Sequence, residues 1–321
     1  MGSLPLITIG ITSYNAVSSI ERAILSGVNQ SWKNIEIIVV DDCSNDGTID
    51  LLNKLNVKYQ LLKIFENSEN YGVAFSRNKI IKEAEGEFIA FFDDDDESDY
   101  NRVEQQFNRI KEYENDFAKG DLVICHCTRM QIYPNGDKHI EQTIGMSEGA
   151  LVPNGEDVAR QILTGKPLAD GNRGSSATCS QMARKSTYEA VGGFDNSFRR
   201  CEDTELNIRL ALSGCHFVGI SSPLVTQTMT KTSDKSLEDE FNFTLNVLKK
   251  HKDYINSVSI YSPCCRWIDI KYTYLSGGKI SFIFKIGQLF LIHPVFVLKR
   301  LCWALPNINF NNTHSRFYNE K

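Results

Sequence analysis

The chain has 321 residues, of which 41% are hydrophobic and 23% are charged, and its formal net charge is −5. This length and this apolar content are enough for one large α/β domain, or for a domain with an appendage, built around a substantial core. Affinity for nucleic acid comes mainly from basic side chains that neutralise phosphates, so the acidic balance argues against a general nucleic-acid-binding protein. We therefore expect no nucleic-acid partner.

Two successive apolar segments each end in polar side chains. Residues 6–12 are typical of a buried strand, and residues 13–15, Ser-Tyr-Asn, follow directly. The ring of Tyr14 is able to stack on a nucleotide base, although a tyrosine after a strand is usually a packing residue. Residues 35–40 form a second β-branched run, which ends in Asp41 and Asp42 and a group of turn-forming residues. We expect these polar side chains to lie at one edge of a sheet.

Four consecutive aspartates, Asp93 to Asp96, follow the apolar run 88–92. Such a run is typical of a buried strand that ends at the protein surface. In open α/β sheets ligands bind at the carboxyl ends of the strands, and clustered carboxylate oxygens suit Mg²⁺ or Mn²⁺ carrying nucleotide phosphates. A solvated acidic loop is the alternative interpretation. The buried strand directly before the acids favours the ligand site.

Helical segments are predicted between and after these strands. Residues 18–28 and 48–55 each open with a Ser or Thr that is placed to cap the exposed amides, and residues 72–84 and 102–113 supply two more helices. Alternation of strands and helices predicts an α/β fold with a mainly parallel, Rossmann-like sheet that has helices on both faces.

The middle of the chain is less regular. Residues 122–125 are strand-like and lie among Gly, Pro and Asn turns. Residues 204–213 predict a helix with Leu206, Leu210 and Leu212 along one side, followed by Gly214 as a stop and by a short strand over 216–220. Glu202 and Asp203 stand at the start of this helix. A carboxylate is favoured electrostatically at that position, so helix capping is the alternative to a chemical role.

These motifs together resemble the family 2 inverting glycosyltransferases with the GT-A fold. The resemblance covers roughly residues 5–220 and rests on residues 12–15, 39–48, 70–78, 86–96, 192–195 and 202–210. Cys43 stands where the family usually has Gly or Asn, and Asp94 where it often has Ser, but neither change removes a carboxylate. The resemblance implies a GT-A catalytic domain over residues 1–225, with a nucleotide-binding half (1–100) and an acceptor-binding half (101–225). A helical extension follows over residues 226–321.

The resemblance also implies roles for individual side chains. Asp95, with Asp93, would hold the Mn²⁺ or Mg²⁺ that bridges the donor diphosphate, and Asp203, supported by Glu202, would be the general base. Tyr14 and Asp42 would hold a uracil base. The residues expected to bind the nucleotide sugar are Thr12, Tyr14, Asn15, Asp42, Asn70, Arg77, Asp93, Asp94 and Asp96. For Arg77 and Arg173, a phosphate contact and a surface salt bridge are both open.

The implied reaction moves a hexose or N-acetylhexosamine from a UDP-sugar to a hydroxyl of an acceptor sugar. Direct displacement inverts the anomeric centre, so an α-linked donor gives a β-linked product. The expected acceptor is a polyprenyl-diphosphate-linked sugar of bacterial O-antigen or capsule assembly. A noncatalytic sugar-nucleotide binding module has no need of Asp203, and a nucleotidyltransferase would use a Gly-rich, basic N-terminal loop that we do not find.

The last part of the chain interleaves apolar and basic residues. Residues 279–305 are too broken for a transmembrane span, which needs about 20 mostly apolar residues. A helix lying in a membrane interface and a hairpin of helices on the catalytic domain are both open. No leader-like segment precedes the first strand, so we expect a cytoplasmic protein, peripheral at the inner face of the plasma membrane. The nine cysteines are then expected to be thiols, and the spacing of residues 125–127 does not fit a zinc site.

Overall fold

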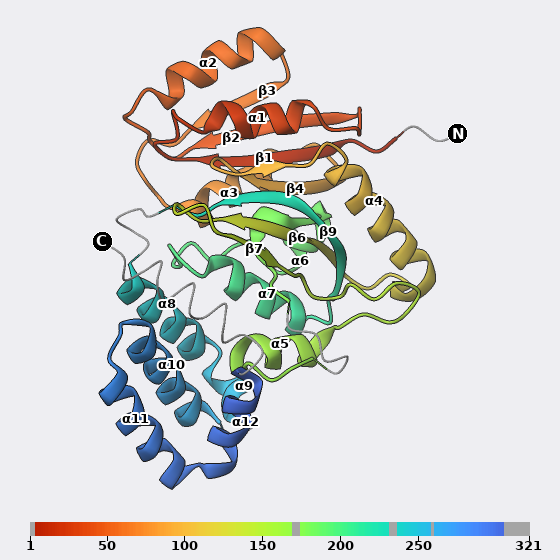
Figure 1. Ribbon diagram of the computed structural model, residues 1–321. Helices are drawn as coiled ribbons and strands as arrows, with labels where there is room; N and C mark the ends of the chain where they lie inside the picture. The colour runs from red at the N-terminus through yellow and green to blue at the C-terminus, as the bar shows by residue number, and fades with distance from the viewer. Residues whose placement is uncertain (1–3, 169–173, 231–235, 258–259, 305–321) are drawn as a thin grey trace. The chain divides into compact units, whose positions relative to one another are not determined.

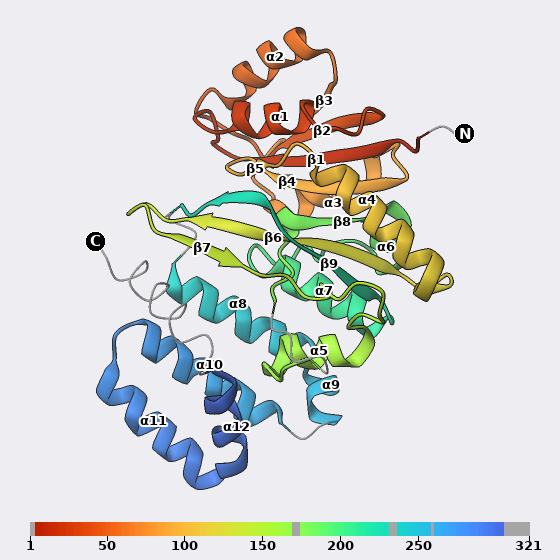
Figure 2. The same ribbon diagram turned by 45° about the vertical axis from the view of Figure 1, so that its right-hand side comes forward.

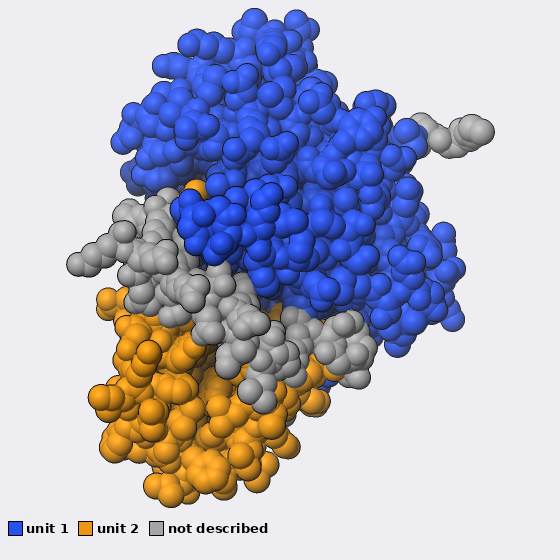
Figure 3. Space-filling view, viewed as in Figure 1, with its two compact units in different colours: residues 1–158, 169–229 blue, residues 159–168, 230–321 orange. Residues whose placement is uncertain are grey.

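A computed structural model describes residues 4–168, 174–230, 236–257 and 260–304 of the chain. The chain divides into two compact units, which Figure 3 shows in different colours. The first unit consists of residues 1–158 and 169–229, and the second of residues 159–168 and 230–321.

Among the described residues of the first unit, a nine-stranded sheet has the order β3-β2-β1-β4-β8-β6-β9-β5, with β7 paired to β6 (Figure 1). Its strands are β1 (Ile7–Ser13), β2 (Ile35–Asp41), β3 (Leu62–Glu66), β4 (Phe88–Asp93), β5 (Glu97–Ser98), β6 (Val123–Ile132), β7 (Lys138–Glu141), β8 (Gln181–Arg184) and β9 (His216–Thr228).

The first four strands form the parallel part that the alternation predicts. β1 pairs in parallel with β2 and with β4, and β2 pairs in parallel with β3. The helices of this part are α1 (Ile20–Val28), α2 (Thr48–Tyr59), α3 (Val73–Glu83) and α4 (Arg102–Tyr113). A Cβ added to Gly10 would lie 2.5 Å from Cγ2 of Ile80 in α3, whereas Gly27 of α1 lies against Ile9. Adjacent strand residues point to opposite faces, so α1 and α3 cover the two faces of β1.

The helix starts differ from the predicted caps. The N-cap residues of α1 and α2 are Ser19 and Gly47, and neither makes a side-chain capping bond. The Thr48 hydroxyl instead donates to Asp46 at 2.5 Å and accepts from the amide of Ala16 at 2.9 Å. The predicted caps at residues 18 and 48 are therefore wrong, because Thr48 holds two loops together.

The second part of the sheet is mixed. β8 lies antiparallel between β4 and β6, while β6 and β9 are parallel. The predicted strands over 122–125 and 216–220 are the beginnings of the longer β6 and β9. A π-helical turn over Glu114–Ala118 precedes β6, and a 3₁₀ turn over Thr178–Ser180 precedes β8. The helices of this part of the chain are α5 (Gly155–Thr164), whose residues from 159 on belong to the second unit, α6 (Lys185–Ala190) and α7 (Glu202–Leu212). The α/β fold is confirmed, with an antiparallel insertion that strand propensity alone did not predict.

Helix α7 begins at Glu202, two residues before the predicted start at residue 204, and Leu212 does not lie on its buried side. Leu206 and Leu210 are fully buried, whereas 40% of Leu212 is exposed. Residues four positions apart share a helix face and residues two apart do not, so placing Leu212 with the other two was wrong. Gly214 lies beyond the helix end with φ +81°, a conformation that favours glycine.

The second unit is helical. Its helices are α8 (Leu237–Lys250), α9 (Lys252–Ser257), α10 (Tyr261–Leu275), α11 (Lys279–Ile292) and α12 (Pro294–Ala304). Trp267 and Ile270 of α10 form a core with Leu289 of α11 and Val297 of α12. Among the described residues, we find no helix with the combined length and apolarity needed to cross a membrane.

Candidate active site

Three strand ends meet at one edge of the sheet. In the parallel register, Thr12 of β1 lies between Val40 of β2 and Asp93 of β4, and Ser13 lies opposite Asp41. The two acidic runs therefore share one edge, as the sequence predicts. The amide of Tyr14 also donates to Asp94 Oδ2 at 3.0 Å, which ties the residues after β1 to the acidic run after β4.

The acidic run turns back toward the sheet within a few residues. Asp95 accepts a 2.6 Å hydrogen bond from Arg22 of α1 at its carbonyl oxygen. Asp96 Oδ1 accepts from the amide of Thr228, the last residue of β9, at 3.0 Å. These two bonds hold the run in place, so it is not the solvated acidic loop of the alternative interpretation.

Asp96 is a buried carboxyl group with one unpaired oxygen. Only 5% of the residue is exposed, and Oδ2 is buried without a hydrogen-bond partner. Burial, reinforced by the charges of Asp93 and Asp95, raises the pKa of Asp96 well above its ordinary value, although the Thr228 amide and Arg129 oppose this shift. A buried acceptor without a donor costs free energy of folding, and a cation bound at Oδ2 would remove this cost.

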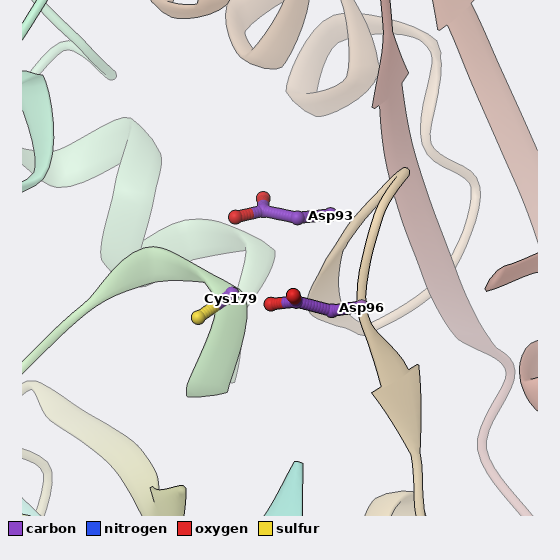
Figure 4. Close-up of side chains that lie close together, drawn as sticks. All are labelled: Asp93, Asp96 and Cys179. Atoms are coloured by element: carbon purple, nitrogen blue, oxygen red, sulfur yellow. The ribbon is translucent and has the colours of Figure 1, made fainter. Parts of the chain in front are cut away.

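Asp93, Asp96 and Cys179 form a cluster whose ligand atoms lie within 4.8 Å of one another. Figure 4 shows the two carboxylates extending toward the same space, with Cys179 beside Asp96. Carboxylate oxygens suit Mg²⁺ and Mn²⁺, whereas burial raises the pKa of the Cys179 thiol well above its ordinary value and so disfavours the thiolate. The two carboxylates, with the orphaned oxygen of Asp96, therefore fit a divalent cation. Asp93 belongs to this cluster as expected, but Asp95, which the resemblance assigns to the metal, is not one of its three members.

Arg77 of α3 joins this cluster to the start of α7. The residue is 4% exposed. Its Nη2 donates to Asp93 Oδ1 at 3.1 Å and its Nη1 to Glu202 Oε1 at 2.5 Å. Burial would lower the pKa of Arg77, but Asp93, Glu202 and Asp203 outweigh it and raise that pKa. Arg77 thus forms buried ion pairs with Asp93 and Glu202. The surface salt bridge considered for Arg77 is wrong, because the residue is buried.

The two acids at the start of α7 have different environments. Glu202 is buried, and burial raises its pKa, which Arg77 opposes and Asp203 reinforces. Asp203 is half-buried and accepts two hydrogen bonds from Thr204 at Oδ1, from the amide at 2.6 Å and from the hydroxyl at 3.2 Å. Both bonds are to one oxygen, so Oδ2 is the oxygen we expect to take part in chemistry.

The residue after Arg77 holds a second segment of the same region. Asn78 donates to the carbonyl of Phe194 and accepts from the amide of Phe194, both at 2.8 Å. A Cβ added to Gly193 would lie 2.4 Å from Asn78 Oδ1, so the close approach needs a glycine there. Arg77 and Asn78 together fix residues 193–202 to α3.

Asp42 is committed to bonds within the protein. It is 4% exposed. Oδ1 accepts from the Asn67 side chain at 2.8 Å and from the amide of Tyr71 at 3.0 Å, and Oδ2 accepts from the amide of Gly72 at 2.7 Å. The structure thus gives Asp42 the role of holding the loop before α3. Its expected contact with a base stays a prediction.

The remaining expected ligand residues lie around the same edge. Tyr14 is 49% exposed, which leaves its ring accessible for stacking. Asn15 accepts from the amide of Asn45 at 2.9 Å and so ties the β1 and β2 loops together. Asn70 accepts a 3.0 Å bond from Arg199. Arg173 lies outside the described residues.

Sequence reasoning missed Cys179 and Arg129. Arg129 of β6 is buried and donates to Gln227 at 2.6 Å and to Ser175 at 2.7 Å. Neither residue stands in a recognisable motif, so no local signal marks them. The structure places Cys125, His126 and Cys127 inside β6 with all three buried, which confirms them as structural residues of a strand.

Comparison with known proteins identifies relatives of the first part of the chain. Residues 8–156 match the sequence model described as "Glycosyl transferase family 2". Glu202, Asp203 and Cys179 lie beyond this match.

Three curated relatives align with this chain over 108 to 130 residues. The chain is 35% identical to an uncharacterized glycosyltransferase of Haemophilus influenzae, over 40% of this chain and 52% of that protein. It is 37% identical to the putative teichuronic acid biosynthesis glycosyltransferase TuaG of Bacillus subtilis, over 34% of this chain and 43% of that protein. It is 34% identical to the Escherichia coli UDP-Glc:alpha-D-GlcNAc-diphosphoundecaprenol beta-1,3-glucosyltransferase WfaP, over 38% of this chain and 50% of that protein. The matched part thus spans about half the length of these relatives or less.

The structure is similar to that of S. aureus TarS 1–349 in complex with UDP-GlcNAc, with a TM-score of 0.55 and 17% identity over 97% of this chain and 89% of that one. At this identity the likeness shows the fold, and the GT-A fold expected from the motifs is confirmed.

Proposed function

We propose, from the match of residues 8–156 to the glycosyl transferase family 2 model, that the chain is an inverting glycosyltransferase that uses a UDP-sugar donor. The observation that carries the proposal is the bridge from Asp93 through Arg77 to Glu202. It brings the acids at the end of β4 next to the acids at the start of α7. Transfer of a sugar requires both sets, one for the leaving diphosphate and one for the attacking hydroxyl.

The donor site lies at the end of β4. A Mn²⁺ or Mg²⁺ held by Asp93 and Asp96, with Asp95 and Cys179 near them, would neutralise the charge that develops on the departing diphosphate. The exposed ring of Tyr14 stacks on the base, and Thr12, Asn15, Asp42, Asn70 and Asp94 shape or line the nucleotide site. Arg77 positions Asp93 and does not contact phosphate in this scheme, because its guanidinium is occupied by two carboxylates.

Asp203 is the general base of the proposal. Glu202 is buried and its Oε1 is bound to Arg77, so we assign it to supporting Asp203 and not to contacting the acceptor. Asp203 is half-buried and keeps Oδ2 for the acceptor hydroxyl. A carboxylate is competent as a base when the leaving group departs early and the hydroxyl acidifies in the transition state. Direct displacement needs no covalent intermediate and converts an α-linked donor into a β-linked product.

The names of the relatives suggest donors and an acceptor. WfaP is named for UDP-Glc and a diphosphoundecaprenol-linked sugar, and TarS has been solved with UDP-GlcNAc. We therefore propose a hexose or N-acetylhexosamine donor and a polyprenyl-diphosphate-linked acceptor in O-antigen or capsule assembly. A lipid-linked acceptor would bring a cytoplasmic enzyme to the inner face of the plasma membrane.

Release of UDP tests the proposal. The full chain is incubated with UDP-glucose, UDP-galactose or a UDP-N-acetylhexosamine, with Mn²⁺ or with EDTA, and with or without a synthetic lipid-diphosphate sugar. We expect UDP release that needs both the metal and the acceptor, and a β-linkage by NMR. Metal-dependent UDP binding without turnover on any acceptor would indicate a binding module. Pyrophosphate release from UTP and a sugar phosphate would indicate a nucleotidyltransferase.

A further inference from the structure

Helix α11 in the second unit has two apolar faces. On its inner face, Leu289 is 1% exposed and packs with Trp267 and Ile270 of α10, and Phe282 and Ile286 lie against the same core. This face accounts for the folding of α11 onto α10. The helix therefore needs no further apolar side chains in order to be held in the unit.

The outer face of α11 is nevertheless apolar. Ile280 is 87% exposed, Ile283 67%, Phe284 65% and Leu291 83%. The last three follow Ile280 at spacings of 3, 4 and 11 residues, so all four lie in one stripe along the helix. Single exposed apolar residues are ordinary on protein surfaces, but a contiguous stripe marks a surface that meets an apolar partner.

Helix α12 presents a second set of the same kind. Val295 is 64% exposed and Leu298 53%, at a spacing of 3 residues, while Val297 is fully buried in the core shared with α10 and α11. In Figures 1 and 2, α11 lies along the outer margin of the second unit. We call the six exposed residues the outer face: Ile280, Ile283, Phe284, Leu291, Val295 and Leu298.

The charged residues of α11 and α12 have one sign. Residues 279–304 contain Lys279, Lys285, Lys299 and Arg300 and no Asp or Glu, although the whole chain has a net charge of −5. Lys285 is paired with Asp269 at 2.8 Å, and the guanidinium of Arg300 lies 5.0 Å from the centre of the Trp267 ring. Lys279 and Lys299 are exposed. Two exposed cations therefore accompany an apolar stripe.

We propose that the outer face docks on an anionic lipid bilayer, with the apolar side chains among the acyl chains and Lys279 and Lys299 at the lipid phosphates. An anionic bilayer offers both an apolar layer and a negative surface, which matches this pairing of side chains. A second copy of the chain is the other candidate occupant. A symmetric contact would place two like-charged faces against each other, so the charges favour lipid. The proposal does not depend on which reaction the first unit performs.

Vesicle sedimentation of the full chain tests the proposal. The probes are vesicles of phosphatidylglycerol and phosphatidylethanolamine, with pure phosphatidylcholine for comparison. We expect the wild type to bind the anionic vesicles and the Ile283→Glu/Leu291→Glu variant to lose at least about 10-fold in binding. Val57→Glu is the matched control, because Val57 of α2 in the first unit is 80% exposed. It should bind as the wild type does.

Two further variants separate the contributions of charge and of apolar surface to lipid docking. Lys279→Gln/Lys299→Gln should lose several-fold in binding to anionic vesicles and little to phosphatidylcholine. Ile283→Ser/Leu291→Ser repeats the main test without added charge, and circular dichroism checks that each variant is folded. Equal vesicle binding by folded wild type and Ile283→Glu/Leu291→Glu overturns the proposal. A wild type that binds no vesicles also overturns the proposal. In that case, a dimer in solution that the Ile283→Glu/Leu291→Glu variant converts to a monomer would identify a second copy of the chain as the occupant.

Discussion

The segment after β4 and the start of α7 each bury a carboxyl group, and the two carboxyl groups differ in their partners. Glu202 is 9% exposed and its charge is met by Arg77 at 2.5 Å. Asp96 is 5% exposed and keeps one oxygen without a hydrogen-bond partner. A buried charge requires an opposite charge or a proton. The fold thus gives Glu202 a permanent cation, Arg77, whereas under the proposed function Asp96 would take an exchangeable one.

The largest expected effect tests Asp203, the half-buried acid at the start of α7. Asp203→Asn keeps an oxygen for the Thr204 amide and removes the proton acceptor, so turnover should fall about 10²- to 10⁴-fold with folding and UDP affinity little changed. Steady-state UDP release and a UDP titration measure the two quantities. Glu189→Gln, an exposed carboxylate of α6, is the matched control and should turn over normally. Near-normal turnover of Asp203→Asn would rule out this base and point to Glu202 or Asp96.

The next test removes the permanent cation. Arg77→Met leaves Asp93 and Glu202 without their shared partner, and breaking a buried ion pair in this way typically costs about 3–5 kcal/mol of unfolding free energy. Urea denaturation measures the loss. Lys111→Met is the control, because Lys111 pairs with Glu114 near the surface, and its loss should stay below about 1 kcal/mol. A similar small loss for Arg77→Met would mean that the bridge does not persist in solution.

The third test concerns the exchangeable cation. Asp96→Asn should weaken the Mn²⁺ dependence of UDP binding by at least about 10- to 100-fold, the range seen even for partners that only support metal ligands. UDP is titrated with Mn²⁺ and with EDTA, on the wild type, Asp96→Asn and Asp95→Asn. The cluster of Asp93, Asp96 and Cys179 predicts that the loss at Asp96 is at least as large as at Asp95. Full metal enhancement in Asp96→Asn together with its loss in Asp95→Asn would contradict that cluster.

The smallest effect is a dependence of stability on pH. Burial raises the pKa of Asp96 well above its ordinary value of 3.8. In EDTA, at pH values between the unfolded and the folded pKa, the folded chain therefore holds a proton that the unfolded chain has lost. Stability should then fall as pH rises above about 4, by about 1.4 kcal/mol per pH unit until the folded pKa is passed. Urea denaturation of wild type and Asp96→Asn, in EDTA, measures the slope. An unchanged slope in Asp96→Asn would assign it to other groups.

The parallel edge of the site could be predicted because its signals are local. An apolar run followed directly by acids predicts the carboxyl end of β4. Strands that pair with β4 in parallel have their carboxyl ends at the same edge of the sheet. The motif containing Arg77 was recognisable too. Its ion pair was not, because Glu202 lies 125 residues further along the chain.

The antiparallel insertion and the position of Cys179 could not be predicted, because they too depend on contacts between residues that are distant in the sequence. β8 reaches β4 through a register that pairs Ile89 with Ala183, and β-strand propensity says nothing about such distant partners. Cys179 stands in a short 3₁₀ turn next to β8. Its place beside Asp96 therefore follows from that pairing and not from any motif.

The bonds of Arg77 and Asn78 have a consequence for how the protein is made. Their partners, Glu202 and Phe194, are 125 and 116 residues away, and a ribosome needs roughly 6 to 25 s to add that many residues. During this interval Arg77 has Asp93 as a partner but lacks Glu202, and the ring of Phe194 does not yet lie against its guanidinium. We therefore expect that the first hundred residues do not form a stable nascent domain. A transcript truncated before α7 should yield a chain that proteases remove.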